Sequence, residues 1–192
     1  MKRVSHIVPI AVAFEGALGL AGVGLCTWFA IPLEARLAVT GSSLARAAVA
    51  TLPTLVMLAC LMRSRWRPLA ELRQQVETLV GELFRDASLA GLAIVAVAAG
   101  VGEELLFRGA LQPLAARWVG PTAGVAAVSL LFGAAHALSW TYFLLAAAIG
   151  GYLGWLEYRF DDLLTPMFVH AAYDFAALVV VQRRALGGER EA

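Results

Sequence analysis

The stretch VGEELLFRGA at residues 101–110 places three charged side chains in an otherwise apolar part of the chain. Glu104 and Arg108 are four residues apart, so a helix would put them on one face, where they can form an ion pair. Glu103 lies about 100° around the same helix and keeps a carboxylate without that partner. A charge at the bilayer centre costs about 2.5–3.5 kcal/mol on insertion scales, so such a carboxylate indicates a function.

Two of the three histidines lie in other apolar segments. His136 ends the stretch FGAAH, in which Phe132 precedes it by four residues and could wall off a cavity. His170 begins the stretch HAAYD, and Asp174 follows it by four residues. Asp174 could accept one ring N–H of His170 and fix the ring, or it could position a substrate oxygen.

These residue types can hydrolyse an amide without a serine or cysteine nucleophile. Glu103 can take a proton from water, His136 can orient that water, and His170 can donate to the oxyanion of a tetrahedral intermediate. The same three residues could instead bind zinc as a His₂Glu set with one open water position. The compact HExxH motif of metalloproteases is absent. Zinc stays a candidate cofactor, and a metal-free mechanism is the alternative.

Each residue also has a structural interpretation. A single histidine in a packed helix is more often a hydrogen-bonded core residue, and a single Glu–Arg pair more often joins helices. Glu15, in the first apolar segment, is interpreted as structural or left unassigned.

The composition indicates a membrane protein. The chain has 192 residues, of which 60% are hydrophobic and 15% are charged, whereas soluble domains have about 45–50% and about 25%. The net charge of +1 gives no reason to expect nucleic-acid binding. Cys26 and Cys60 have no metal-ligand spacing and predict no disulfide framework.

Apolar segments of about 20 residues predict spanning helices. Six occur, at residues 7–30, 44–62, 88–111, 121–137, 140–158 and 163–182. The first is too long for the apolar region of a signal peptide, so we expect it to be retained. The predicted fold is therefore an all-α, polytopic membrane bundle of about six transmembrane helices plus one amphipathic helix.

The amphipathic helix is predicted within residues 63–86, where Pro68 can occupy its first turn. Apolar residues recur there at helical spacing, with charges opposite: Leu69, Leu72, Val76, Leu79, Val80 and Leu83. Two interpretations remain open, a helix lying on the membrane surface and a connector with one apolar side.

Lysine and arginine predict the orientation. With the N-terminus inside, the inner segments hold Lys2, Arg3, Arg63, Arg65, Arg67, Arg73, Arg85, Arg183, Arg184 and Arg190, and the outer segments hold Arg36, Arg46, Arg108, Arg117 and Arg159. Both termini are thus predicted to be cytoplasmic. We divide the chain into an N-terminal part, 1–87, a catalytic core, 88–182, and a frayed cytoplasmic tail, 183–192.

Taken together, three motifs carry a resemblance to a known family. EELLFR, FGAAH and HAAYD, in this order on successive apolar segments, resemble the EExxxR, FxxxH and Hxxx(N/D) motifs of the CPBP family of intramembrane proteases, which includes CAAX prenyl endopeptidases. The resemblance covers about residues 88–182 and implies that Glu103 is the general base and that His136 polarises the attacking water. It further implies that His170 stabilises the oxyanion together with Asp174, and that Glu104 and Arg108 hold the helix.

One residue departs from the family pattern. The prototype CAAX enzymes carry asparagine where this chain has Asp174, and an ionised aspartate cannot donate a hydrogen bond to an oxyanion. We therefore interpret Asp174 as the residue that orients His170.

The resemblance implies a membrane-anchored protein or peptide substrate. The short chain resembles compact bacterial members of the myxosortase type, and its Ala- and Arg-rich composition is typical of a high-GC bacterium. We therefore expect an endopeptidase of the bacterial inner membrane that cleaves near the C-terminal, cysteine-containing sorting signal of exported proteins. The alternatives are a CAAX-type prenyl-protein endopeptidase, a non-catalytic immunity or peptide-binding protein, and a small transporter.

The predicted spans also give depths for the site. Glu103 would lie about 12 Å below the outer end of its span and His170 about 10 Å below that of its own, which predicts a site nearer the outer face. The position of His136 does not fit this prediction, because it lies about 22 Å from the outer start of its span and so near the inner end.

Overall fold

A computed structural model describes residues 6–188, and within this range the chain is helical and has no β-strand. The elements in chain order are α1 (Ile7–Trp28), η1 (Ala35–Leu37), α2 (Gly41–Arg63), α3 (Arg67–Phe84), α4 (Leu89–Glu104), η2 (Leu105–Leu111), α5 (Gln112–Val119), α6 (Pro121–Ala135), α7 (Trp140–Phe160) and α8 (Leu164–Gly188). The predicted all-α class is confirmed.

Local side-chain caps fix where several helices begin. The Thr40 hydroxyl accepts the backbone N–H of Ser43, and the Ser43 hydroxyl accepts that of Thr40, at the start of α2. Ser139 caps α7 by accepting the backbone N–H of Tyr142. Pro68 lies in the first turn of α3, as predicted. The hydroxyls of Thr40, Ser43 and Ser139 pair with backbone N–H groups that a helix start leaves unpaired, and Pro68 has no N–H to pair.

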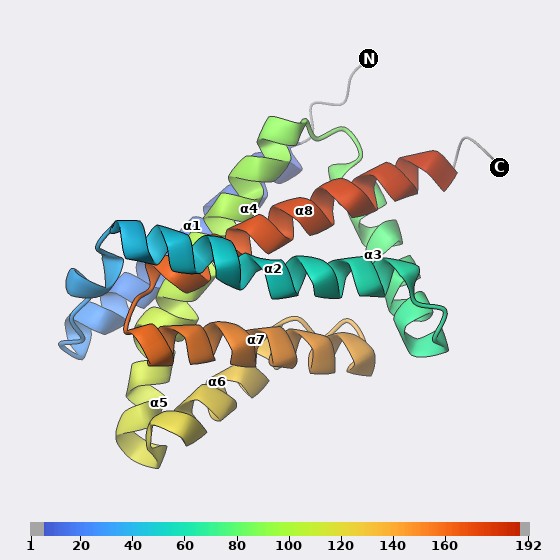
Figure 1. Cartoon of the computed structure of the whole chain (residues 1–192). Coiled ribbons are helices and arrows are strands. Elements are labelled where there is room, and N and C mark those ends of the chain that lie inside the picture. Colours follow the sequence, from blue (N-terminus) through green and yellow to red (C-terminus); the bar gives the residue numbers. More distant parts are fainter. Residues whose placement is uncertain (1–5, 189–192) are drawn as a thin grey trace.

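The long apolar segments run back and forth through the molecule (Figure 1). Within residues 6–188, four helical stretches are long and apolar enough to cross a membrane: Ile7–Trp28, Gly41–Arg63, Leu89–Val119 and Leu164–Gly187. α6 is apolar but has only 15 residues, and α7 is outside this set. Four of the six predicted spans are thus confirmed by length and composition.

The third span is longer than predicted. Instead of ending at residue 111, the helix continues from α4 through the π-helical segment η2 into α5 and ends at Val119. Glu103 therefore lies about 24 Å, not 12 Å, from the end of this stretch. That depth agrees with the 22 Å estimated for His136, so the disagreement came from a predicted boundary that was too early.

Glycines bring α1 and α4 into close contact. A side chain at Gly102 would overlap the backbone carbonyl of Glu15, and one at Gly22 would lie 2.6 Å from the carbonyl carbon of Leu105. Small residues of this kind let helix backbones approach each other in membrane proteins. The contact places Glu15 beside the residue that precedes Glu103.

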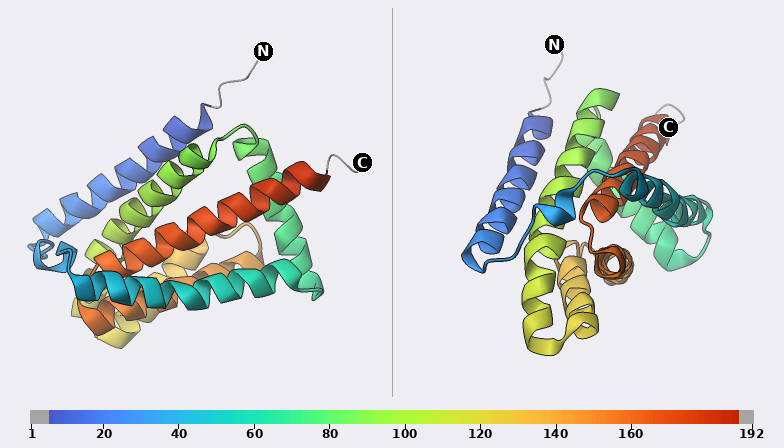
Figure 2. Two further views of the ribbon diagram at one scale, coloured as in Figure 1. Left: turned by 45° about the horizontal axis from the view of Figure 1, so that its top comes forward. Right: turned by 60° about the vertical axis from the view of Figure 1, so that its left-hand side comes forward.

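Helix α3 lies across the ends of α2 and α8 (Figure 2). Arg73 of α3 donates to the carbonyls of Met62 and Ser64 at the end of α2, at 3.2 and 3.1 Å. Gln182 of α8 donates to the carbonyls of Phe84 and Ala87 after α3, at 2.6 and 2.9 Å. These bonds satisfy carbonyls that helix ends leave unpaired and tie α3 to the bundle.

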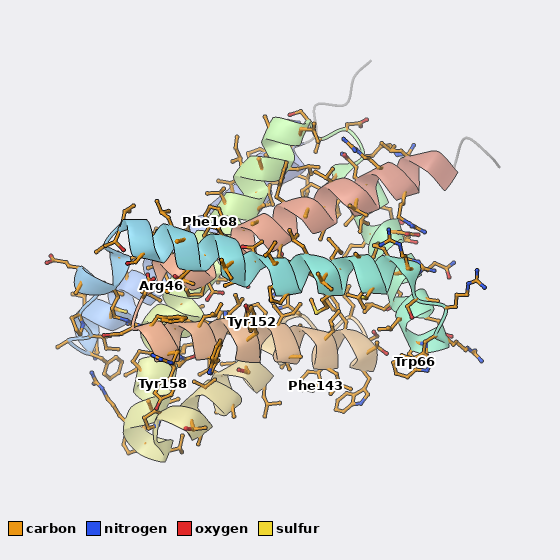
Figure 3. The ribbon with its side chains drawn as sticks, in the orientation of Figure 1. Arg46, Trp66, Phe143, Tyr152, Tyr158 and Phe168 are labelled. Atoms are coloured by element: carbon orange, nitrogen blue, oxygen red, sulfur yellow. The ribbon has the colours of Figure 1, made fainter. Side chains whose placement is uncertain are left out.

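A small apolar cluster joins α2, α7 and α8. Ala50, Leu153, Leu156 and Val169 are all buried in it. Tyr152 lies between α2 and α7, where its hydroxyl donates to the carbonyl of Ala50 at 2.8 Å (Figure 3). This cluster sets the position of the N-terminal part of α8, which carries His170.

Some sequence predictions concern the chain ends. The predicted tail at 183–192 is helical as far as Gly188, because α8 extends to that residue, and 189–192 lie outside the described residues. Lys2, Arg3 and Arg190, which contributed to the predicted orientation, also lie outside them. The orientation and the division at 87/88 stay predictions.

Candidate active site

The first motif lies where the helix changes its winding. α4 ends at Glu104 and continues as η2, a π-helical segment of seven residues. Segments of this kind occur frequently at functional sites, because the extra residue per turn re-aims side chains. Arg36 supports the segment by donating to the carbonyls of Arg108 and Gly109, at 3.0 and 3.3 Å. Arg36 in turn pairs with the buried Glu157 of α7.

Glu104 and Arg108 form the predicted ion pair. Nη1 of Arg108 donates to Oε1 of Glu104 at 2.5 Å, and both side chains are fully buried. Nη2 donates to the carbonyl of Gly150 in α7 at 2.8 Å, and the guanidinium lies 4.5 Å from the ring centre of Phe132. Because a buried charge needs partners, these contacts fix Arg108 between η2, α6 and α7.

The ion pair also fixes the C-terminal histidine. Oε1 of Glu104 lies 2.9 Å from Nδ1 of His170, and Nε2 of His170 lies 3.4 Å from Oδ2 of Asp174. Both ring nitrogens of the buried imidazole therefore face carboxylates, the nearer of which is Glu104. The predicted Asp174 contact exists, but Glu104, which sequence reasoning paired only with Arg108, holds the ring more closely.

Glu103 faces the second histidine. Its Oε2 lies 3.6 Å from Nε2 of His136, and this buried oxygen has no hydrogen-bond partner among the described residues. Nδ1 of His136 lies 2.9 Å from the carbonyl of Phe132, so it can donate there and leave Nε2 toward Glu103. The Phe132 ring stacks on His136 with centroids 4.4 Å apart and meets the His170 ring edge-on at 5.9 Å. Phe132 thus separates the two histidines.

A mostly apolar cavity of about 310 Å³ opens beside Glu103. Asp174 also lines it, whereas Glu104 and Arg108 do not. The apolar face of α3 forms one wall, because all six residues of the predicted stripe line the cavity: Leu69, Leu72, Val76, Leu79, Val80 and Leu83. The structure therefore favours the second interpretation of this helix, a connector whose apolar side covers the protein.

The cavity extends from the polar centre to the amphipathic helix. Its wall reaches from Glu103 past Tyr142 and Leu178 to α3. Helix α3 lies at the end of the bundle where α1 begins and α8 ends (Figure 2). The membrane face to which the site opens stays a prediction, and its expected depth depended on a third span that ended too early.

Three polar residues of the cavity wall were not predicted to be site residues. Glu15 of α1 lies there, and its buried Oε2 has no hydrogen-bond partner in the described part of the chain. Tyr142 of α7 and Tyr173 of α8 lie there as well. The charge of Glu15 within an apolar segment and the adjacency of Tyr173 to Asp174 were the available signals, whereas Tyr142 reaches the site only through helix packing.

Within residues 6–188, the candidate zinc ligands are not arranged as a metal site. Among residues 6–188, no group of three or more His, Cys, Asp and Glu side chains is arranged to hold a metal ion. The candidate set fails because His170 contacts Glu104 and Asp174, whereas His136 faces Glu103. The mechanism considered below therefore uses protein side chains and water.

The fold and the site define a polytopic α-helical membrane protein with a buried carboxylate–histidine centre. The model of the family described as type II CAAX prenyl endopeptidase Rce1-like matches residues 85–176, which contain all three motifs. The resemblance to CAAX-type endopeptidases that the motifs indicated is thus confirmed over this segment. No curated protein and no solved structure matches the chain.

Proposed function

We propose that this protein is an intramembrane endopeptidase in which Glu103 activates a water molecule. The observation that carries the proposal is the unpartnered, buried Oε2 of Glu103, which faces His136 beside an apolar cavity. A buried carboxylate oxygen without a hydrogen bond is costly for stability, which favours a role in chemistry over a role in packing.

The proposed reaction begins with a water held between Glu103 and His136. Their 3.6 Å separation is longer than a direct hydrogen bond, so both groups can contact one water oxygen. Glu103 takes a proton as the water oxygen bonds to the scissile carbonyl carbon, which produces a tetrahedral oxyanion. The proton then passes to the amide nitrogen, the C–N bond breaks, and a carboxylic acid and an amine leave.

The second histidine stabilises the oxyanion in this proposal. Nε2 of His170 is held only loosely by Asp174, at 3.4 Å, so its N–H can turn toward a substrate oxygen. Glu104 and Arg108 act as positioning residues, because they fix the His170 ring and the helix that carries Glu103. Asp174 contributes orientation of the ring, since an ionised carboxylate only accepts hydrogen bonds.

The cavity supports a substrate with an apolar anchor. Its walls are aliphatic over most of α3 and the facing parts of α2 and α8, and they meet the polar centre at Glu103 and Asp174. A segment that leaves the bilayer could place its apolar part there with the scissile bond at the carboxylates. We propose a C-terminally anchored protein as substrate, and the sorting signal of an exported protein in an inner bacterial membrane as the first candidate.

The direction of the cavity favours a second candidate. If the termini are cytoplasmic, as the arginine distribution predicts, the cavity extends toward the cytoplasmic side. A C-terminal peptide of the CAAX type, carrying a lipid on cysteine, would approach from that side. The two candidates differ in where the substrate resides, and one experiment can separate them.

The experiment compares protein masses in the native host with those in a strain whose chromosomal copy carries Glu103→Ala. Loss of a C-terminal fragment from anchored proteins only in the wild type would identify both the substrate and the bond. Cleaved proteins found outside the cytoplasm would favour the sorting signal, and cytoplasmic ones the CAAX type. Identical masses in both strains, with the variant present in the membrane, would reject hydrolysis and favour a peptide-binding protein.

A further inference from the structure

Hydrolysis, the function proposed above on which this inference rests, requires more hydrogen-bond donors to the oxyanion than the residues named so far provide. A tetrahedral oxyanion is commonly stabilised by more than one positioned donor, and removing one donor costs about 10²–10³ in rate. His170 can offer only one N–H, because its Nδ1 is engaged with Glu104. Asp174 stands where the prototype enzymes have a donating asparagine, and as a carboxylate it accepts only. A second donor must come from another residue.

Tyr142 has the position and the chemistry of such a donor. It lines the cavity together with both carboxylates, Glu103 and Asp174. Within residues 6–188 its hydroxyl has no hydrogen-bond partner, in contrast to the Tyr152 hydroxyl, which donates to a backbone carbonyl. A phenol keeps its proton near neutral pH and can therefore donate.

The surroundings hold the Tyr142 ring beside the cavity. The ring packs against the buried cluster that contains Phe107, Val128 and Phe132. It also meets the His136 ring edge-on, with centroids 6.3 Å apart. A donor fixed before the reaction stabilises developing charge without having to reorganise, which is the property an oxyanion site requires.

We propose that the hydroxyl of Tyr142 donates a hydrogen bond to the oxyanion and takes the place of the missing asparagine donor at position 174. Glu103 and His136 would then hold the attacking water. Tyr142 and His170 would donate hydrogen bonds to the carbonyl oxygen as it becomes the oxyanion. Tyr142 is thus a catalytic residue by contact with the reacting oxygen.

Tyr158 provides a control on the same helix. It lies in α7, as Tyr142 does, but it is 53% exposed and does not line the cavity beside Glu103. The two tyrosines therefore share a helix and a phenol hydroxyl but differ in their relation to the site.

The test measures kcat, KM and the melting temperature of the purified, full-length protein in detergent, with the substrate found in the host comparison. Tyr142→Phe removes only the hydroxyl oxygen, so we expect kcat to fall about 10²–10³-fold while KM and melting temperature stay unchanged. We expect Tyr158→Phe to keep kcat close to the wild-type value.

Three results would overturn the proposal: an unchanged kcat in Tyr142→Phe, an equal loss in both variants, or a loss accompanied by a higher KM or a lower melting temperature. Failure of the proposed function would look different, because Glu103→Ala would then cleave as well as the wild type or the wild type would not cleave at all.

Discussion

Glu104 and His170 are 66 residues apart in sequence, yet Oε1 of the glutamate lies 2.9 Å from Nδ1 of the histidine. The same oxygen accepts from Arg108, so one carboxylate joins the first motif to the last. The adjacent Glu103 faces His136 instead. Two neighbouring glutamates thus have separate tasks, because a helix turns them about 100° apart.

This division of tasks predicts different losses in two isosteric variants. In Glu104→Gln the buried Arg108 loses its counter-charge, and breaking a buried pair costs about 3–5 kcal/mol, so the melting temperature in detergent should fall sharply. Glu103→Gln leaves no buried cation unpaired and should keep its melting temperature. Glu71→Gln, in an exposed pair with Arg67, is the control and should not change it. Equal melting temperatures for the two site variants would contradict the assignment.

His136→Ala should lower cleavage by about 10²–10⁴-fold, because the variant loses the group that orients the water. His136 is half-buried at the end of α6, and among the described residues its ring makes no ion pair apart from the contact with Glu103, so membrane abundance should stay close to wild type. The rate is measured with the identified substrate. His6→Ala, which changes the exposed histidine before α1, serves as control, and full activity of His136→Ala would reject the water-orienting role.

Gly102→Ala should separate α1 from α4. The new methyl group would overlap the carbonyl of Glu15, and because backbone atoms cannot yield as a flexible side chain can, overpacking of about 1–3 kcal/mol or more is expected. The melting temperature and cleavage should both fall. Gly16→Ala is the matched control, since its methyl group would meet nothing within 4 Å. Equal stability of the two variants would show that the contact is not tight.

Removal of metal ions should leave cleavage unchanged. The donors Glu103, His136 and His170 do not converge on one point, so we expect purified protein treated with EDTA to keep its rate and to contain zinc far below one ion per chain. Elemental analysis and the cleavage assay on the same sample check this. A rate lost with EDTA and restored by zinc alone would contradict the expectation and bring back the His₂Glu alternative.

Cysteine labelling can establish the orientation of the cavity. In a Cys60→Ser background, Arg65→Cys reports the end of the bundle near α3, and Glu34→Cys reports the opposite end. If the termini are cytoplasmic, an impermeant maleimide added to spheroplasts should label residue 34 and not residue 65, and inverted vesicles should give the reverse. The opposite pattern would place the cavity toward the outer face and favour exported substrates.

The sequence alone determined the local features of this protein. Apolar length and helical spacing predicted the α-helical bundle, the Glu104–Arg108 pair and the apolar face of α3, because each depends on residues within a few turns of one helix. The three motifs also identified Glu103, His136, His170 and Asp174 as the residues to examine, and the structure places them in two contacts, Glu103 with His136 and His170 with Asp174.

Only the tertiary structure decided which partners meet. That Glu104 binds His170, that Arg36 supports η2 and that Glu15 and Tyr142 reach the cavity all depend on the register and tilt of helices far apart in the chain. Close packing at Gly102 and the π-helical turn at η2 set that register. Sequence spacing carries no information about either, because both arise from contacts between helices and so appear only once the bundle is assembled.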